Sequence, residues 1–299
     1  SILRGVLEIA GHEIKLRHGS FPAIDPNSVK GGSHHGDMAI IAYGTLGAAE
    51  LGYDSDLDIV FLFEGGQELS DGKRPLPPER YYARMAQRVL SFLTVMTPSG
   101  RLYEVDTRLR PNGRAGSLVS SLSAFRDYQS NTAWIWELQA LTRAHYVAGQ
   151  RSVQVRFDRI RRETLCQPRN SDELRAELLD MRHKMRQEHD ANARLDTARS
   201  PKHCSGGLID IEFIAQLGIL SSAQAYPRVL QVNSTLEQIG QLRSIGWLTP
   251  EEADVLTKTA QTLSQCRMIS SLLADEPAPS LDTRASAEIF AQKLGPANP

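Results

Sequence analysis

Hydrophobic and polar positions follow one pattern in the front of the chain and another in the back. Between Met38 and about Leu109, short apolar runs of the kind that strands contain alternate with turns rich in glycine or proline. The strands predicted in this way cover 38–43, 57–63 and 101–106. Residues 78–96 have apolar positions near helical spacing and follow Pro77, so we predict one helix in this part.

From about Ser121 onward, glycine and proline become less frequent and the apolar spacing becomes helical. The clearest helix start is Thr249-Pro250-Glu251-Glu252, with threonine as N-cap, proline in the first position and glutamate in the third. The helices predicted in this part cover 121–130, 132–147, 150–165, 171–190, 207–223, 233–245, 249–274 and 283–294. Two segments, 19–37 and 275–283, are predicted loops.

These patterns predict an α+β protein in which a part with strands and helices precedes an all-helical part. We expect the front domain to cover residues 1–120, beginning with a helix and a loop, and the helical domain to cover residues 121–299.

Composition and charge narrow the class of protein. The 299 residues are 41% hydrophobic, which argues against disorder. The 34 Lys and Arg residues nearly balance the 35 Asp and Glu residues, which argues against a broad nucleic-acid-binding surface. No apolar run approaches the roughly 20 residues that span a bilayer. Charged residues near the start argue against a signal peptide, and three widely separated cysteines fit a reducing compartment. We therefore expect a cytoplasmic protein whose partners include neither nucleic acid nor membrane.

The sharpest chemical feature is a pair of aspartates at the second predicted strand. Asp56 and Asp58 are two residues apart, and side chains with this spacing on a strand point to the same face. Two neighbouring carboxylates repel each other unless a cation lies between them, and such hard oxygen ligands suit Mg²⁺ or Mn²⁺. The alternative is that both acids merely solvate the end of a strand.

A glycine turn precedes this pair and a third acid follows it. Gly44 and Gly47 permit a tight turn whose backbone N–H groups can approach phosphates, and the Thr45 hydroxyl can add a contact. Asp106 ends the third predicted strand and could complete a triad of carboxylates from a neighbouring strand.

Two arginines follow the third acid. Arg108 and Arg110 are alternate residues that could direct guanidinium groups toward anionic oxygens, or could form a surface ladder of ion pairs. The acids and the glycine turn together predict the metal and triphosphate site of a nucleotidyltransferase. Metals would neutralise phosphate charge and support pyrophosphate as it leaves, and one carboxylate would help to take the proton of the attacking hydroxyl.

Four sequence blocks resemble one bacterial family. They are Ala42–Leu62, Leu102–Pro111 with Gly113–Gly116, Tyr128-Gln129 with Ala133–Ala144, and Gly206–Phe213. In this order they are similar to blocks of the glutamine synthetase adenylyltransferase family, which belongs to the polymerase-beta-like nucleotidyltransferase superfamily. The resemblance runs from about residue 38 to 275. It implies a catalytic domain with a small mixed sheet and helices, followed by a helical bundle domain.

The resemblance also implies an activity and partners. The family transfers AMP from ATP to a tyrosine hydroxyl of glutamine synthetase, and full-length members carry a second unit that removes AMP. The block Trp134-Ile135-Trp136-Glu137 is similar to the AMP-adding half, so we expect this chain to be a fragment that works with the other half. Glutamine synthetase is then the protein substrate, and the PII signal protein and glutamine are expected regulators.

Residue by residue, the resemblance assigns catalysis and metal binding to the three acids, Asp56, Asp58 and Asp106. Nucleotide binding is assigned to Gly44, Thr45, Gly47, Ser55, Arg108 and Arg110. The chain departs from the family near the turn, where Ala42, Thr45 and Ala48 replace the usual glycine, lysine and glycine.

Other readings of the same residues stay open. Removal of AMP by phosphorolysis needs the same acids, and a module that binds nucleotide or glutamine synthetase without turnover would explain the missing lysine at position 45. Nucleotidyl transfer to nucleic acid is disfavoured by the near-neutral charge. In the back part, Gly206-Gly207 could begin a helix that binds an anion, or Asp210 and Glu212 could be polar residues opposite an apolar stripe.

Overall fold

The computed structural model describes residues 2–21, 37–53, 55–66, 68–98, 100–101, 103–192, 200–273 and 283–294. Most of the two predicted loops, 19–37 and 275–283, lies outside these residues. Within the described ranges, every helix is too short or too polar to cross a bilayer. Cys166, Cys204 and Cys266 are free thiols.

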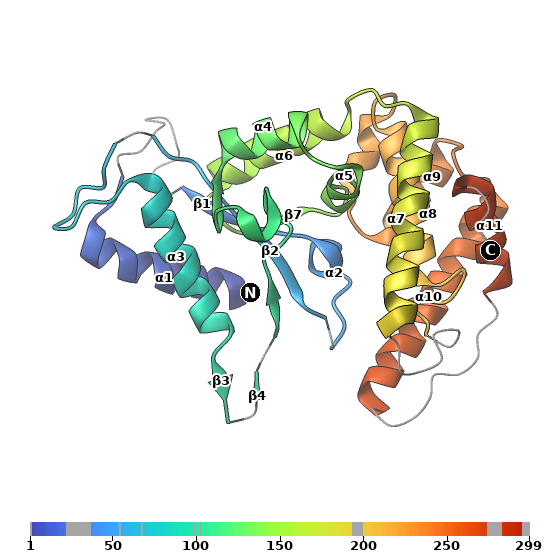
Figure 1. The fold of residues 1–299 in the computed structure, drawn as a ribbon, viewed down its shortest axis with the longest axis horizontal. Helices are drawn as coiled ribbons and strands as arrows, with labels where there is room; N and C mark the ends of the chain where they lie inside the picture. The colour runs from blue at the N-terminus through green and yellow to red at the C-terminus, as the bar shows by residue number, and fades with distance from the viewer. Residues whose placement is uncertain are drawn as a thin grey trace. The chain divides into compact units, whose positions relative to one another are not determined.

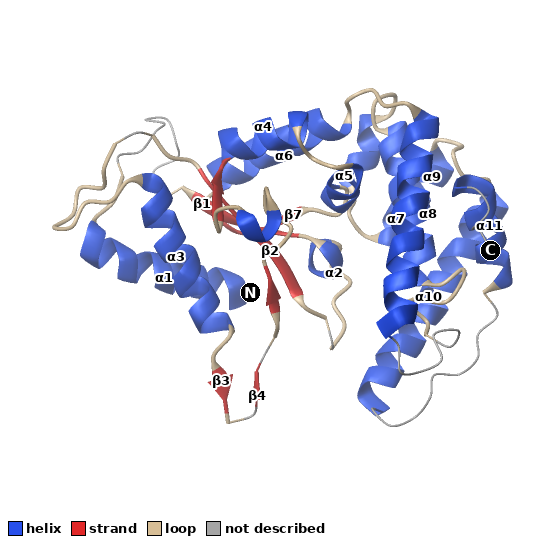
Figure 2. Cartoon of the chain, in the orientation of Figure 1, coloured by secondary structure: helices blue, strands red, loops and turns tan. Residues whose placement is uncertain are grey.

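The architecture combines a small sheet with many helices (Figures 1 and 2). The helices are α1 (Ile2–His18), α2 (Gly44–Gly47), α3 (Pro78–Leu93), α4 (Leu122–Asn131), α5 (Ile135–Leu141), α6 (Arg151–Leu165), α7 (Ser171–Asn192), α8 (Leu208–Ser222), α9 (Thr235–Ser244), α10 (Pro250–Leu273) and α11 (Arg284–Leu294). The strands are β1 (Met38–Ala42), β2 (Leu57–Phe63), β3 (Met96–Thr97), β4 (Gly100–Arg101), β5 (Val105–Asp106), β6 (Val119–Ser121) and β7 (His145–Gly149). The predicted order, a part with a small mixed sheet before a helical part, is confirmed.

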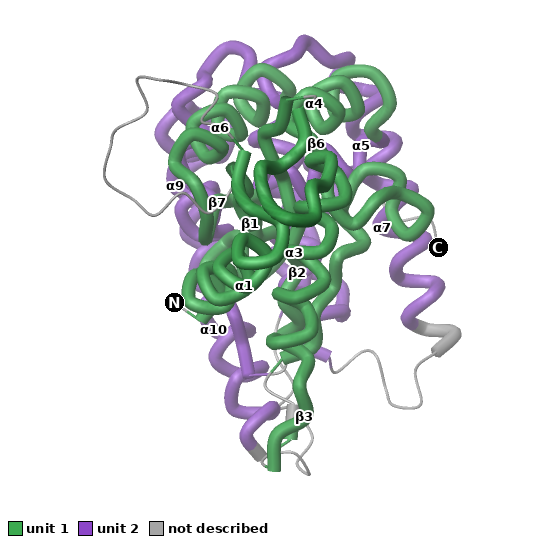
Figure 3. Tube along the Cα trace, turned by 90° about the vertical axis from the view of Figure 1, so that its left-hand side faces the viewer, with its two compact units in different colours: residues 1–50, 55–133, 144–164 green, residues 51–54, 134–143, 165–299 purple. Residues whose placement is uncertain are grey.

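The chain divides into two compact units (Figure 3). The first unit consists of Ser1–Glu50, Ser55–Ala133 and Ala144–Thr164. The second unit consists of Leu51–Asp54, Trp134–Arg143 and Leu165–Pro299. The first unit therefore holds the sheet and the second holds α5 and α7 to α11. The domain boundary expected at residue 120 stays a prediction.

The main sheet of the first unit is mixed. Its strand order is β5-β2-β1-β7, and β6 also pairs with β2. β1 runs antiparallel to β2 and β7, whereas β2 runs parallel to β5 and β6. β5 pairs with the first residues of β2 and β6 with its last residues. The start of β2, where the predicted acid pair lies, is thus flanked by β5, which carries the third acid.

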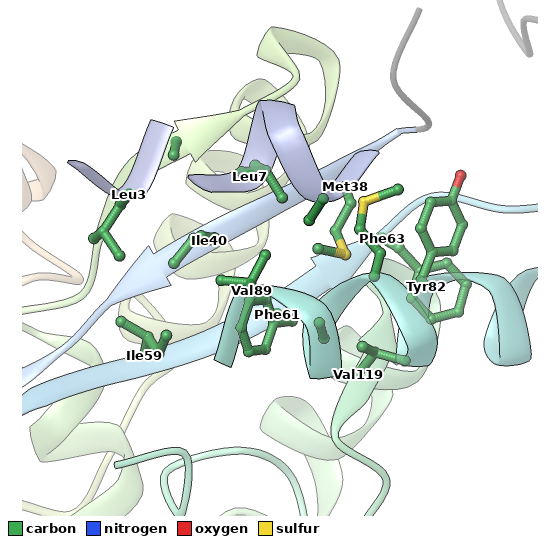
Figure 4. Close-up of a cluster of buried hydrophobic side chains, with 14 of the residues drawn as sticks. Leu3, Leu7, Met38, Ile40, Ile59, Phe61, Phe63, Tyr82, Val89 and Val119 are labelled. Carbon is green, nitrogen blue, oxygen red and sulfur yellow. The ribbon is translucent and has the colours of Figure 1, made fainter. Parts of the chain in front are cut away.

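A hydrophobic core fixes β2 in place. Side chains of Ile40 on β1 and of Ile59 and Phe61 on β2 pack with Leu7 of α1 and Val89 of α3 (Figure 4). All five are buried, and burying a side chain of this size stabilises a fold by about 1.5–3 kcal/mol. Alternate residues of a strand point to one face, so the apolar positions that enter this core also set the direction of the residues between them.

Two predicted helix starts are confirmed. At α10, the Glu252 N–H donates to Thr249 Oγ1 at 3.2 Å and the Thr249 N–H donates to Glu252 Oε2 at 2.8 Å, which is a capping box. At α3, the helix begins at Pro78 directly after Pro77, and it ends at Leu93 rather than continuing to residue 96.

The helix predicted over 132–147 is wrong in its second half. α5 ends at Leu141, and His145–Gly149 form β7, which pairs with β1. The partner strand lies far earlier in the sequence, so local spacing alone cannot reveal this pairing. The strand predicted over 101–106 is also divided, because Arg101 ends β4 and Val105–Asp106 form β5.

Candidate functional site

Asp58 and Asp106 lie side by side on neighbouring strands. β2 and β5 pair in parallel, and their register sets Asp58 opposite Asp106 and Leu57 opposite Val105. Paired residues of parallel strands point to the same face of the sheet, and the strands are about 4.8 Å apart. The two carboxylates therefore belong to one face of the sheet, beside the start of β2.

Asp56 joins this pair from the segment just before β2. Its side chain is exposed, whereas that of Asp58 is half-buried. The pKa of Arg108 is raised above its usual value, first by hydrogen bonding to Asp106 and then also by the charges of Asp58 and Asp56. All three predicted acids thus lie within electrostatic reach of one guanidinium.

Arg108 holds the Asp106 carboxylate by three contacts. Its backbone N–H donates to Oδ1 at 2.8 Å, its Nε donates to Oδ2 at 2.7 Å, and its Nη2 lies 2.5 Å from Oδ2. Partial burial raises the pKa of the Asp106 carboxyl, but the hydrogen bonds and the charge of Arg108 outweigh burial and hold this pKa below its usual value. Asp106 is therefore ionised at neutral pH.

The three acids fit a divalent cation by their chemistry. Their donors are all carboxylate oxygens, the ligands that Mg²⁺ and Mn²⁺ prefer, and a cationic guanidinium already lies among them. In the part of the chain that the structure describes, no three acidic, histidine or cysteine side chains are grouped closely enough to hold a metal ion. The Asp106 carboxylate is paired with Arg108 instead.

Gly44 brings the glycine turn against Asp58. Its φ of +53° is a left-handed conformation that glycine adopts without strain, and a Cβ atom at this position would overlap the Asp58 carboxylate. The Tyr43 N–H also donates to the Asp58 carbonyl oxygen at 2.9 Å. The turn continues as α2, and the first N–H groups of a helix have no acceptor within it.

Thr45 and Gly47 lie in the same turn. The Thr45 carbonyl accepts the Glu50 N–H at 2.8 Å, and the Gly47 N–H donates to the Tyr43 carbonyl at 2.8 Å. Ser55 is buried directly before the acid pair.

Two of the three departures from the family pattern are easily accommodated. Ala42 ends β1 and is fully buried, so its methyl group adds to the core. Ala48 has φ of −81°, a conformation open to any residue, so no glycine is required there.

Arg110 is placed differently from Arg108. Its guanidinium donates to the Thr107 carbonyl at 2.7 Å, to the Thr107 hydroxyl at 3.0 Å and to the Gly116 carbonyl at 3.3 Å, which ties together the loop after β5. Of the two predicted arginines, the structure therefore brings Arg108 to the acids and uses Arg110 within the loop. Sequence reasoning missed Arg114, whose charge helps to lower the pKa of Asp106. Its position in a family block was the available signal.

Asp210 and Glu212 form ion pairs inside the second unit. Arg182 Nε donates to Asp210 Oδ1 at 2.6 Å, and the Gly206 N–H donates to Asp210 Oδ2 at 2.7 Å. Glu212 pairs with Arg143 at 2.9 Å. The anion at the helix entry after Gly206 is thus a carboxylate of the chain itself.

Comparison with known proteins decides the family. Residues 1–160, more than half of the chain, match the family described as glutamate-ammonia ligase adenylyltransferase. The chain belongs to this family. Residues 173–298 match a second family, described as GlnD PII-uridylyltransferase.

Members of the adenylyltransferase family from several bacteria are similar over most of the chain. The identity is 41% over 276 residues for Xanthomonas campestris pv. campestris, 44% over 257 for Methylococcus capsulatus and 39% over 267 for Pseudomonas aeruginosa. All three are named bifunctional glutamine synthetase adenylyltransferase/adenylyl-removing enzyme. The matches cover 91%, 85% and 86% of this chain but 28%, 26% and 27% of the relatives, so the chain spans about a quarter of their length. The family resemblance inferred from the four sequence blocks is confirmed.

Proposed function

We propose that this chain transfers AMP from ATP to a tyrosine hydroxyl of glutamine synthetase and releases pyrophosphate. The observation that supports this most is the pairing of Asp58 with Asp106, with Gly44 packed against Asp58. Carboxylates from two strands beside a glycine turn supply what a reaction at a triphosphate needs, namely metal ligands and backbone donors. The names of the relatives support AMP as the transferred group.

The three acids would carry the chemistry. Asp56, Asp58 and Asp106 would hold Mg²⁺ or Mn²⁺, which when bound supply neutralisation of the triphosphate charge. One of these carboxylates takes the proton of the tyrosine hydroxyl while the tyrosine oxygen bonds to the α-phosphorus of ATP. The bond from that phosphorus to pyrophosphate breaks, and the proton passes from the carboxylate to solvent.

The turn and the arginine would bind the nucleotide. The N–H groups at the start of α2, in Gly44 and Thr45, would donate to phosphate oxygens, with Ser55 beside them. Gly47, whose N–H donates to the Tyr43 carbonyl, would contribute by closing the turn. Arg108 would exchange its carboxylate partner for a phosphate when Asp106 binds metal. Arg110 would act by holding the loop that carries Arg108 in shape.

The chain would be the AMP-adding unit of a longer enzyme. The block Trp134–Glu137 supports this half rather than the AMP-removing one. Residues 1–120 would form the catalytic domain and residues 121–299 the helical bundle domain. The other half, the PII signal protein and glutamine are proposed as partners and regulators.

A labelling experiment separates the candidate functions. ATP labelled in its α-phosphate is mixed with the chain, Mg²⁺ and unmodified glutamine synthetase, and the label in glutamine synthetase is counted. Incorporated label supports AMP transfer. Labelled ADP released from adenylylated glutamine synthetase by inorganic phosphate, without incorporation in the first assay, would instead identify the AMP-removing unit. ATP binding without either reaction would identify a regulatory module.

A further inference from the structure

A second charged cluster lies between α7 and α8, inside the second unit. Arg182 of α7 and Asp210 of α8 are each 1% exposed, and they form the 2.6 Å ion pair described above. Arg186 stands one helical turn after Arg182 and donates to Asp210 Oδ2 at 3.2 Å, beside the Gly206 N–H. Both oxygens of Asp210 are thus engaged by donors of the chain.

Among the described residues, the side chains that form the ion pairs of this cluster carry more positive charge than negative charge. Arg182 and Arg186 share a single carboxylate. The Nη2 of Arg182 donates to the His203 carbonyl at 3.2 Å, but its Nη1 is buried and has no hydrogen-bond partner among the described residues. A buried cationic donor without an acceptor is unfavourable, and Asp210 has little remaining capacity to accept. An acceptor beside Arg182 Nη1 would satisfy this donor, and a negatively charged acceptor would also balance the second arginine.

Further basic groups surround the same place. The rings of His203 and His189 stack with their centroids 3.6 Å apart. Burial lowers the pKa of His203 to about 4, and the charges of His189, Lys202, Arg182 and Arg267 lower it as well. These four basic side chains show that positive charge gathers around the ring of His203.

We propose that this cluster binds an oxyanion, the phosphate or carboxylate group of a small molecule. Arg182 Nη1 would donate to it from the buried side, and Arg186, whose side chain is 27% exposed, would donate from the side open to solvent. The planar guanidinium matches the oxygens of both groups. The bound anion would hold α7 against the start of α8, so it would stabilise this unit independently of the acids in the first unit.

Calorimetric titration with inorganic phosphate and, separately, with acetate tests the proposal and shows whether the cluster binds a phosphate or a carboxylate group. Ionic strength is held constant with chloride. We expect saturable binding of at least one anion. Arg186→Gln removes a donor but leaves the buried pair of Arg182 and Asp210, and it should raise the Kd about tenfold. Arg175→Gln removes an exposed arginine of the same helix and should leave the Kd unchanged. Thermal unfolding shows that each variant is folded.

Phosphate could also bind the nucleotide site of the first unit, so the site of binding has to be located. The NMR resonances of the His189 and His203 rings report on the anion bound at this cluster. In the unmodified chain they should shift with the same Kd as the calorimetric signal, and Arg186→Lys, which keeps the charge, should retain most of the shift. Three results would overturn the proposal. The first is that neither anion binds saturably. The second is that an anion binds but leaves these resonances unchanged, and the third is that Arg175→Gln and Arg186→Gln weaken anion binding equally.

Discussion

Asp106 stands opposite Asp58 in the parallel pairing of β2 with β5, and Arg108 holds it there by both backbone and side chain. Two ionised carboxylates on adjacent strands repel each other, so their proximity is stable only with a positive charge between or beside them. In this structure that charge is a guanidinium. In the proposed reaction it would be a divalent metal ion, and the guanidinium would turn to the phosphates.

The ion pair of Arg108 and Asp106 should make a small contribution to stability that depends on pH. The pKa of Asp106 is lowered in the folded protein, so the contribution is present above its unfolded pKa of about 4 and is lost as the pH falls through the folded pKa. The Arg108 side chain is 61% exposed, so the contribution should be below about 1 kcal/mol. Urea unfolding of Arg108→Ala should show this loss at pH 7 and a smaller loss at pH 3. An equal loss at both values would point to packing instead.

Arg108 should also compete with metal for Asp106. Without nucleotide, Arg108→Ala should tighten Mn²⁺ binding several-fold, measured by electron paramagnetic resonance of the free ion. With metal present, the same variant should weaken ATP binding about tenfold, because a charged contact to phosphate is lost. Arg126→Ala removes an exposed arginine of α4 and serves as the control for general charge. Weaker Mn²⁺ binding by Arg108→Ala would rule out the competition.

Gly44→Ala should damage both stability and activity. An alanine in the left-handed conformation costs about 1–2 kcal/mol, and its methyl group would displace the Asp58 carboxylate. The matched control is Gly5→Ala in α1, where a Cβ atom meets nothing within 4 Å. That change should stabilise the protein by about 0.5–1 kcal/mol, since alanine is the better helix former. Thermal unfolding compares the two variants; equal effects would mean that the turn does not require glycine at position 44.

Thr45 is the residue where the chain departs most from its family in chemistry. If its hydroxyl contacts phosphate, Thr45→Ala should weaken ATP binding by about 0.5–1.5 kcal/mol, the net value of one neutral hydrogen bond. Thr45→Lys, which restores the usual residue, should bind ATP as well or better, because a charged contact is worth about 1.5–3 kcal/mol. Equilibrium dialysis with ATP measures both. Unchanged dissociation constants in the two variants would show that residue 45 does not touch the phosphates.

Much of the candidate site could be predicted from the sequence, because the residues that define it are close together in the chain. The spacing of Asp56 and Asp58 and the glycines of the turn act over a few residues, and strand geometry then sets their directions. The capping box at Thr249 is equally local.

The features that could not be predicted depend on pairing between distant segments. β7 forms because its residues pair with β1. The apolar spacing of 145–149 alone is compatible with a helix as well. Arg108 and Arg110 are equivalent by spacing, but the loop after β5 turns one toward the acids and the other toward its own carbonyls. The buried partner of Asp210 is Arg182, which no short-range pattern connects to it.

The measurement that tests the account most directly is Mg²⁺-dependent transfer of labelled AMP to glutamine synthetase by single carboxylate variants. Loss of residues that merely support a metal ligand costs about 10–100-fold, so Asp58→Asn and Asp106→Asn, as lost ligands, should each reduce transfer at least about 100-fold. Both should remain folded, because Asp58→Asn removes repulsion from the metal-free protein and Asp106→Asn loses at most the small contribution of the ion pair with Arg108. Glu104→Gln, which neutralises an exposed acid directly before β5, should retain activity. Transfer at the level of the unmodified chain by either aspartate variant at saturating Mg²⁺ would contradict the assignment of these acids to the reaction.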